Sequence, residues 1–544
     1  MKQYLRQHIT AALEAMGITS GAAVAFEKPR QADYGDLTTN IAMVLAKEAG
    51  RKPRDLAGAI VAGLNLDPGL VASVEIAGPG FINFAFTGNY LLRQLEHLLA
   101  DSRTFGASTI GGGKKAQVEF VSANPTGPLT VGHGRGAVTG DTVARLLEWT
   151  GYHVDREYYF NNAGRQMRIL GDSVRLRYLS LLGDVTPFPD DYYQGEYITD
   201  IARHLVDAHG AALRAEPPEG KFKEQAEHEI FADIQRTLKS LGIVFGSFYN
   251  ENSLYEDGKI REVVEALRER GLVYEQEGAL WFKVSALGGE KDKVIVKGTG
   301  EPTYRLPDIA YHREKFRRGY DLMVDVFGAD HIATYPDVLA GLRALGYDEA
   351  KVKVLIHQFV TIMQEGEAVK MSTRKANFIT LDELIAEVGA DVVRYFFIMR
   401  TMSSHLNFDL ALAKKRSDEN PVYYLQYAHA RIASLLRYAG AERNGPDSGT
   451  FNPALLTESA EIELIRTLLL FPEIVESCAV SFEPHRLAEY LQAVATAFHK
   501  FYHECRIVTE DAPLTEARLA LSRATRAVLR NGCTILGIQA PEQM

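Results

Sequence analysis

The sequence predicts a multidomain protein built around an α/β domain with a parallel sheet, and three patterns lead to this prediction. From residue 116 to about residue 390, apolar strand-like runs alternate with helical runs, which is typical of a parallel sheet. Residues 391–544 hold successive amphipathic helical runs, which indicates an all-α helix bundle. Residues 1–110 combine helices with two strands. We therefore expect an N-terminal α+β domain at 1–110, a Rossmann-like domain at 111–390 and a helical domain at 391–544.

Composition excludes several classes of protein. The net charge of −10 argues against a generally basic nucleic-acid coat protein, although a local basic face stays possible. The three cysteines, Cys478, Cys505 and Cys533, form no CxxC pair, so we expect neither a metal site nor a disulfide framework. No apolar run approaches the roughly 18 residues needed to span a bilayer, and the N-terminus is charged throughout. We therefore expect a cytoplasmic protein without membrane contact.

The N-terminal domain is predicted from helical spacing and one turn. Apolar residues from Leu5 to Met16 recur at helical spacing, and further helices are expected at 37–49 and 53–64. Two strands flank the turn Gly78-Pro79-Gly80. These elements suffice for a small α+β unit.

The segment from Val118 to Tyr152 carries the first candidate site. It reads as a strand, a loop rich in Gly and Pro at 122–136, and a helix. This order offers free backbone N–H groups and a positive dipole end to a phosphate. Gly132 and Gly134 would let a nucleotide approach the backbone, and His133 between them supplies a hydrogen-bond donor. A helical insertion at about 178–254 then interrupts the alternation of strands and helices.

Two acidic residues stand out near the same sheet edge. Glu119 lies inside an apolar strand, where an ionised carboxylate needs a partner. Asp308 is four residues after Tyr304, so on a helix or its first turn the two share a face.

The combination of motifs resembles one family along nearly the whole chain. PTGPLTVGHGRG is similar to the HIGH signature of class I aminoacyl-tRNA synthetases, and VKMSTRKAN resembles their KMSKS signature. ADYGDLTTNIAM, AGPGFINF, NPVYYLQYAHARI and LGIQAPEQM are similar to segments of bacterial arginyl-tRNA synthetases. The resemblance implies ATP-dependent ligation of L-arginine to tRNA(Arg) through arginyl-adenylate. It also implies Mg²⁺ bound to the ATP phosphates, and a monomer.

The resemblance also implies residue roles. For catalysis these are His133, Lys370, Ser372 and Thr130, with Thr130 standing where the family usually has His. ATP would contact Gly132, Gly134, Arg135, Met371 and Arg374. Arginine would contact Glu119, Ser122, Asn124, Tyr304 and Asp308. For tRNA we expect Asn83, Tyr424, Arg523, Arg526 and Arg530, the three arginines sharing one helical face.

Three alternatives stay open at this point. The chain fits another class I synthetase, or a nucleotidyl transferase that uses a HIGH loop on a small molecule. The transferase would not need the two terminal domains. Thr130 also suits a catalytically weakened relative that only binds tRNA. The leading interpretation requires the loops around His133 and Lys370 to fold together.

Overall fold

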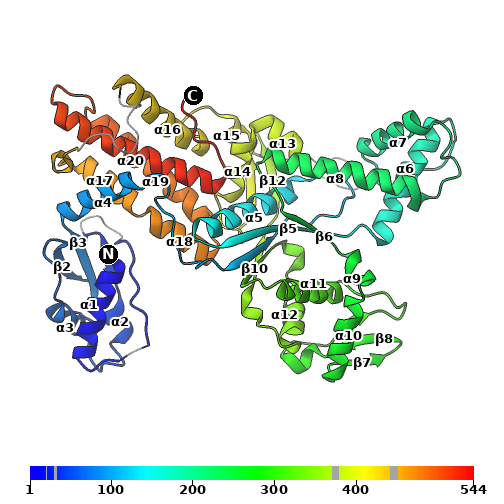
Figure 1. Cartoon of the computed structure of the whole chain (residues 1–544), viewed down its shortest axis with the longest axis horizontal. Helices are drawn as coiled ribbons and strands as arrows, with labels where there is room; N and C mark the ends of the chain where they lie inside the picture. The colour runs from blue at the N-terminus through cyan, green and yellow to red at the C-terminus, as the bar shows by residue number, and fades with distance from the viewer. Residues whose placement is uncertain (20, 30–33, 370–378, 441–450) are drawn as a thin grey trace.

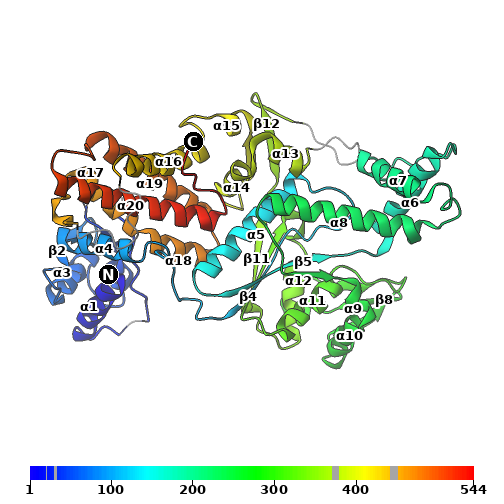
Figure 2. The same cartoon turned by 45° about the horizontal axis from the view of Figure 1, so that its top comes forward.

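A five-stranded parallel sheet lies at the centre of the computed structural model, which describes residues 1–19, 21–29, 34–369, 379–440 and 451–544. Its strands are β4 (Lys115–Glu119), β5 (His153–Phe160), β6 (Ser247–Asn250), β10 (Leu322–Gly328) and β11 (Val352–His357). They follow the order β11-β10-β4-β5-β6, and every neighbouring pair is parallel (Figure 2). The predicted parallel-sheet domain is thereby confirmed.

Helix α5 (Val131–Trp149) follows β4 and begins earlier than the sequence predicts. The predicted loop 122–136 ends at Thr130, so His133 lies in the first helical turn. The glycines mislead because they serve close packing rather than a loop. A Cβ atom on Gly134 would lie 2.7 Å from a side-chain carbon of Leu381, and one on Gly140 would lie 2.2 Å from the Phe120 ring.

A helical arm leaves the sheet between β5 and β6. It consists of α6 (Gly164–Leu181), α7 (Glu196–His209) and α8 (Lys223–Ser240), and its far end projects away from the other domains (Figure 1). The arm starts before the predicted residue 178, and the chain is back in the sheet at Ser247. Sequence periodicity cannot separate α6 from an ordinary crossover helix, because both are amphipathic.

A separate lobe packs against the parallel sheet. Its core joins α9 (Asn252–Glu256), α10 (Lys259–Glu269), α11 (Arg305–Arg317) and α12 (Tyr335–Ala344) to the antiparallel sheet of β7 (Val273–Gln276), β8 (Ala279–Phe282) and β9 (Lys293–Val296). Helix α11 is fixed to the parallel sheet by Tyr311, whose hydroxyl donates to Glu157 of β5 at 2.6 Å.

The N-terminal module has its own core. It contains α1 (Lys2–Ala15), β1 (Leu37–Thr39), α2 (Ile41–Leu45), α3 (Pro53–Gly63), β2 (Val71–Ala77) and β3 (Phe81–Phe86), with the antiparallel order β1-β3-β2. The helix predicted at 37–49 is wrong at its start, because residues 37–39 pair with the central strand β3. Asp36 forms an ion pair of 2.7 Å with Arg466, which ties the module to the bundle.

The C-terminal part is a helix bundle, as predicted. Its helices are α14 (Ala390–Ile398), α16 (Pro421–Tyr438), α17 (Ser459–Leu469), α18 (Phe471–Ser481), α19 (His485–Glu504) and α20 (Ala512–Leu536). Helix α4 (Gly88–Ala100) packs against α17 and α20 through its buried leucines. Between the bundle and the parallel sheet lie β12 (Val360–Gln364), β13 (Glu367–Ala368), α13 (Leu381–Val388), β14 (Leu406–Asp409) and α15 (Leu410–Lys414).

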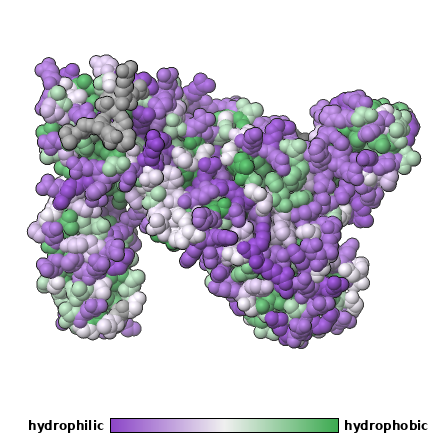
Figure 3. Space-filling model, in the orientation of Figure 1, coloured by the Kyte–Doolittle hydropathy of each residue, from purple (hydrophilic) through white to green (hydrophobic). Residues whose placement is uncertain are grey.

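The N-terminal module and the α9–α12 lobe extend from the same side of the molecule (Figure 1). Figure 3 shows a hollow between them and a surface that is mostly hydrophilic on this face. None of the described helices has both the length and the apolar character that crossing a bilayer requires.

Candidate active site

His133 is held in one protonation form at the N-terminus of α5. Its Nδ1 atom accepts a hydrogen bond of 3.1 Å from the Thr130 backbone N–H, and Thr130 Oγ1 lies 3.2 Å from the same nitrogen. Burial lowers the pKa of His133, while Asp330 acts in the opposite direction. The neutral ring therefore carries its proton on Nε2, where it can donate to an anion at the helix end.

The segments that flank the two signatures are neighbours. Thr130 forms an isolated β-bridge with Thr380, and the Leu381 N–H donates to the Leu129 carbonyl at 2.8 Å. The second signature itself, with Lys370, Met371, Ser372 and Arg374, lies outside the described residues. Its C-terminal flank nevertheless reaches the first turn of α5, as the leading interpretation requires.

Two predicted ATP contacts serve packing instead. Arg135 has no exposed surface, and its guanidinium group donates to the carbonyls of Gln358, Thr401 and Ser404 at 2.8–2.9 Å. Gly134 is enclosed by neighbouring side chains, as its contacts above show. We correct both assignments, because neither residue can reach a nucleotide in this structure. Gly132 is exposed, with open space beside it.

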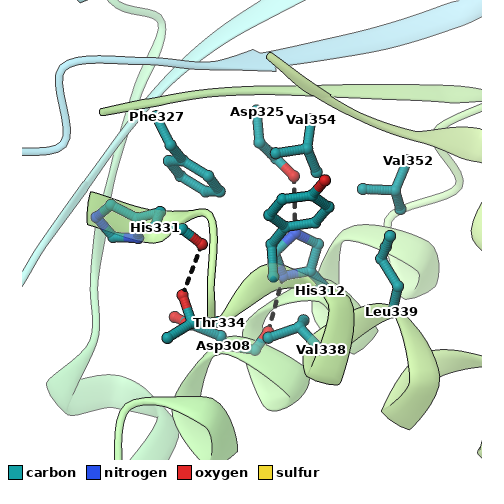
Figure 4. Close-up of a pocket in the computed structure, with 11 residues that line it drawn as sticks. Asp308, His312, Asp325, Phe327, His331, Thr334, Val338, Leu339, Val352 and Val354 are labelled. Carbon is teal, nitrogen blue, oxygen red and sulfur yellow. Dashed lines mark hydrogen bonds and ion pairs between the residues drawn. The ribbon is translucent and has the colours of Figure 1, made fainter. Parts of the chain in front are cut away.

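A buried chain of charges links α11 to the sheet. Lys315 Nζ lies 2.6 Å from Glu119 Oε2 on β4 and 2.5 Å from Asp325 Oδ1 on β10. The second oxygen of Asp325 is 2.8 Å from His312 Nε2, and His312 Nδ1 is 2.8 Å from the Asp308 carbonyl (Figure 4). The partner that a buried Glu119 requires is therefore Lys315. Lys315 is shared with Asp325, and a contact of Glu119 with the substrate stays a prediction.

Asp308 differs from the rest of this chain of charges. Its carboxylate has no hydrogen bond or ion pair with any described residue, and it lines a pocket with Phe327, His331 and Thr334 (Figure 4). Burial raises the pKa of Asp308 to about 7; His312 and Lys315 oppose the rise, and Glu119 and Glu251 add to it. Such a carboxylate gains from a cation that enters the pocket.

Glu251 is an acidic neighbour that sequence reasoning missed. Only 8% of its surface is exposed, and it accepts hydrogen bonds of 2.9 Å from the Tyr159 hydroxyl and the Asn161 side chain. Burial raises its pKa too. No spacing pattern marks this residue. Asp325 is different, because a charge within an apolar strand is the same signal that singled out Glu119.

Ser122 and Asn124 lie at the C-terminal edge of β4 and are fixed by neighbours. Ser122 has a left-handed φ of 44°; its hydroxyl donates to Glu119 at 3.0 Å and accepts from the Tyr159 N–H at 3.2 Å. Asn124 donates to Gln166 and accepts from the Asn161 N–H, both at 3.0 Å.

Tyr304 lies one helical turn before Asp308, as the spacing predicts, and its carbonyl accepts a hydrogen bond of 3.2 Å from the Asp308 N–H. Its side chain is 81% exposed at the N-cap of α11, and its contact with arginine stays a prediction. The four-residue spacing is correct, but the helix begins only at Arg305 and leaves the tyrosine on its open end.

The predicted tRNA contacts are mostly engaged within the protein. Asn83 is 5% exposed on the central strand β3. Arg523 pairs with Glu516, Arg526 pairs with Glu542 at 2.8 Å, and Arg530 donates to the Ser102 carbonyl at 3.0 Å. Asn83 is thus buried and the three arginines are bonded within the protein, and the part of these residues in tRNA binding stays a prediction. Tyr424 is half-buried, and its ring centroid lies 4.8 Å from that of His499.

The described residues include no group of three or more His, Cys, Asp or Glu side chains arranged to hold a metal ion. The three cysteines are buried and unpaired.

Comparison with known proteins gives matches over almost the entire chain. Residues 3–86 match the arginyl tRNA synthetase N terminal domain, residues 94–394 the tRNA synthetases class I (R) catalytic domain, and residues 425–544 the DALR anticodon binding domain. An arginine–tRNA ligase of Desulfotalea psychrophila is 53% identical over 519 residues, which is 95% of this chain and 94% of that protein. One of Salinibacter ruber is 51% identical over the full length of both chains. The solved structure of Thermus thermophilus arginyl-tRNA synthetase has the same fold, with a TM-score of 0.80, 22% identity and full coverage of both chains.

The parallel sheet, the α5 terminus and the catalytic-domain match define a class I aminoacyl-tRNA synthetase. The N-terminal and catalytic-domain matches agree on the arginine branch of that class. The chain belongs to the arginyl-tRNA synthetase family.

Proposed function

We propose that this chain joins L-arginine to tRNA(Arg) in two steps, and that Asp308 recognises the arginine side chain. As a family member the chain is an arginine–tRNA ligase that uses ATP. The observation that carries the residue assignment is the unpaired Asp308 carboxylate beside a second acid, Glu251. A guanidinium group offers the charge and the paired N–H donors that this surrounding lacks.

The first step forms arginyl-adenylate. A carboxylate oxygen of arginine attacks the α-phosphorus of ATP. The bond between the α-phosphorus and the oxygen that bridges to the β-phosphorus breaks, and pyrophosphate is released. The nucleophile is already an anion, so the protein needs no base and contributes position and charge stabilisation. His133 Nε2–H would donate to an α-phosphate oxygen, since its other nitrogen is occupied by Thr130.

The second step transfers the arginyl group. A ribose hydroxyl of the terminal adenosine of tRNA attacks the carbonyl carbon, and AMP leaves.

Lys370 and Ser372 would hold the pyrophosphate end of ATP, with Met371, Arg374 and exposed Gly132 beside the nucleotide. Mg²⁺ would be bound mainly by the ATP phosphates, which supply the oxygen ligands it prefers.

Residues at the C-terminal edge of β4 would position the α-amino and carboxylate groups of arginine. Ser122 and Asn124 lie there with polar side chains, and we assign them to the α-amino and carboxylate groups of arginine. Their existing hydrogen bonds to neighbours orient both side chains before the substrate arrives. The DALR match supports the proposal that the bundle binds the anticodon end of tRNA, and we propose that the chain acts as a monomer.

Aminoacylation of bulk tRNA, tested with each amino acid separately, examines the proposed function directly. We expect product with arginine and ATP only. Pyrophosphate exchange with and without tRNA then separates the alternatives, because a tRNA-binding relative gives no exchange and a small-molecule transferase needs no RNA.

His133→Ala tests the mechanism within the same assay. We expect it to lower kcat by about a hundredfold, the typical cost of one transition-state donor. A matched control is His97→Ala, which changes a histidine in the last turn of α4, far from α5 in the sequence. Unchanged kcat in His133→Ala would remove the donor assignment.

A further inference from the structure

Lys315 lies between two buried carboxylates, those of Glu119 and Asp325. Glu119 on β4 and Asp325 on β10 are register partners in the parallel sheet, so their backbones lie about 4.8 Å apart. Both side chains are buried, at 2% and 0% exposure. Two carboxylates this close and this dry do not both stay ionised without a cation.

Lys315 supplies that cation from the opposite layer. Its side chain is fully buried, its ammonium group contacts both carboxylates, and the Tyr311 ring centroid lies 4.4 Å away. Burial alone would lower the pKa of Lys315, but the two carboxylates raise it. The lysine therefore stays charged inside the protein.

The same helix face leads from Lys315 to the pocket. Asp308, His312 and Lys315 are spaced at i, i+4 and i+7 on α11, so they lie in one row. Asp325 joins the last two, and His312 joins Asp325 to the Asp308 backbone. Lys315 thus fixes the charge and the position of the helix turn that carries Asp308, without contacting the pocket itself.

We propose that Lys315 is a positioning residue, a built-in counter-cation that contacts Glu119 and Asp325, favours their charged forms and leaves Asp308 as the carboxylate offered to the arginine guanidinium. This inference rests on the proposed function. It differs from a purely architectural role, in which Lys315 would only anchor α11 to the sheet.

The two roles differ in how they change the titration of Asp308. The charged and titratable groups around it come from each neighbouring element: Glu119, Tyr159, Glu251, Tyr255, His312, Lys315 and Asp325. Lys315 lowers the pKa of Asp308 and Glu119 raises it. Loss of the lysine should therefore shift the pH dependence of arginine use upward, and loss of the Glu119 charge should shift it downward.

The test uses Lys315→Met, Glu119→Gln and the double variant in full-length enzyme with tRNA. We measure kcat and KM for arginine and for ATP from pH 6 to 9. Lys315→Met should raise the arginine KM by about tenfold or more at neutral pH. It should also move the acid limb of the pH profile of kcat/KM for arginine up by about one pH unit, which is a tenfold change in proton affinity. The ATP KM should stay within about twofold.

Glu119→Gln should move the acid limb the other way, and the double variant should return close to wild type, because it removes one charge of each sign. The control is Lys259→Met, which breaks an α11 ion pair of 2.7 Å with Glu314 away from the pocket and should leave the pH profile unchanged.

If the losses of arginine kcat/KM in the two single variants add in the double variant, and the pH profile does not shift, the proposal is overturned in favour of a structural anchor. A loss of about a hundredfold in Glu119→Gln alone would also overturn it, because Glu119 would then bind the guanidinium directly. If Lys315→Met does not fold, the double variant, which keeps the net charge of the cluster and leaves Asp325 bonded to His312, decides the question. Absence of arginine-dependent product in the wild type would refute the proposed function instead.

Discussion

Two aspartates on the helices that cover the sheet have opposite surroundings. Asp141, on α5, accepts hydrogen bonds from Arg145, Arg156 and Arg394 at 2.7–3.0 Å. The carboxylate of Asp308, on α11, has no partner among the described residues. Burial raises the pKa of both groups, but the three guanidinium groups reverse this for Asp141, whereas Asp308 reaches about 7.

The difference separates architecture from recognition. Arg394 is itself buried and also donates to the carbonyls of Leu536 on α20 and Leu241 after α8, at 2.8–2.9 Å. The Asp141 cluster therefore joins the active-site helix to the bundle and to the arm. An acid whose partners come from the chain stabilises the fold, and an acid left without one is available to a ligand.

Asp141→Ala should show the largest effect, and it acts on stability. Removing the carboxylate leaves the buried Arg394 without its counter-charge, which costs about 3–5 kcal/mol of unfolding free energy. Equilibrium unfolding in urea measures this. The control is Asp184→Ala, which breaks an exposed pair with Arg214 and should cost about 1 kcal/mol or less. Equal losses in both variants would break the distinction drawn above.

Asp308→Asn should have the reverse profile. We expect kcat/KM for arginine to fall by about a hundredfold, or about 3 kcal/mol, with the ATP KM nearly unchanged. Stability should not fall. The folded pKa lies above the unfolded value, so the ionised carboxylate destabilises the fold at pH 8, and the amide removes that penalty. Asp348→Asn, at an exposed cap in the same lobe, is the control. Unchanged arginine dependence would refute the assignment.

Arginine binding should depend on pH in a direction set by Asp308. The ionised carboxylate binds the guanidinium, so below pH 7 a proton must leave, and the Kd should rise towards about tenfold per pH unit. Above pH 7 it should be flat. Equilibrium binding of arginine from pH 5.5 to 8.5 measures this, and Asp308→Asn should abolish the dependence. A wild-type affinity that is constant over this range would show that another group recognises the side chain.

Sequence periodicity predicted the sheet and the bundle, because these follow from local apolar spacing, and the first signature was located by its own residues. It failed where a residue's role depends on what lies across from it. Gly134 looks like part of a loop until Leu381 and Phe397 are seen against it. Arg526 looks free until Glu542 returns beside it from the C-terminal segment.

The same limit applies to the acidic site. The sequence indicated that Glu119, a carboxylate within an apolar strand, requires a partner. Nothing in the sequence distinguishes the substrate from Lys315 as that partner. The residue that remained available, Asp308, was correctly placed one helical turn after Tyr304, but the spacing did not reveal that the Tyr304 side chain is exposed while Asp308 faces a pocket.

Thr130 should give the smallest effect by the same rule, because its polar groups are already bonded within the protein. Thr130→Val keeps the backbone N–H that holds His133 Nδ1 and removes only the hydroxyl 3.2 Å from it. The hydroxyl contributes one neutral hydrogen bond of about 1 kcal/mol to the position of His133, so we expect kcat to fall about fivefold with an unchanged arginine KM. Thr130→Ser, which keeps the hydroxyl, should match wild type. A loss of about a hundredfold in the valine variant would mean that the hydroxyl itself donates to the phosphate, as the histidine usual at this position would, and Thr130 would then belong with Asp308 among the groups available to ligands.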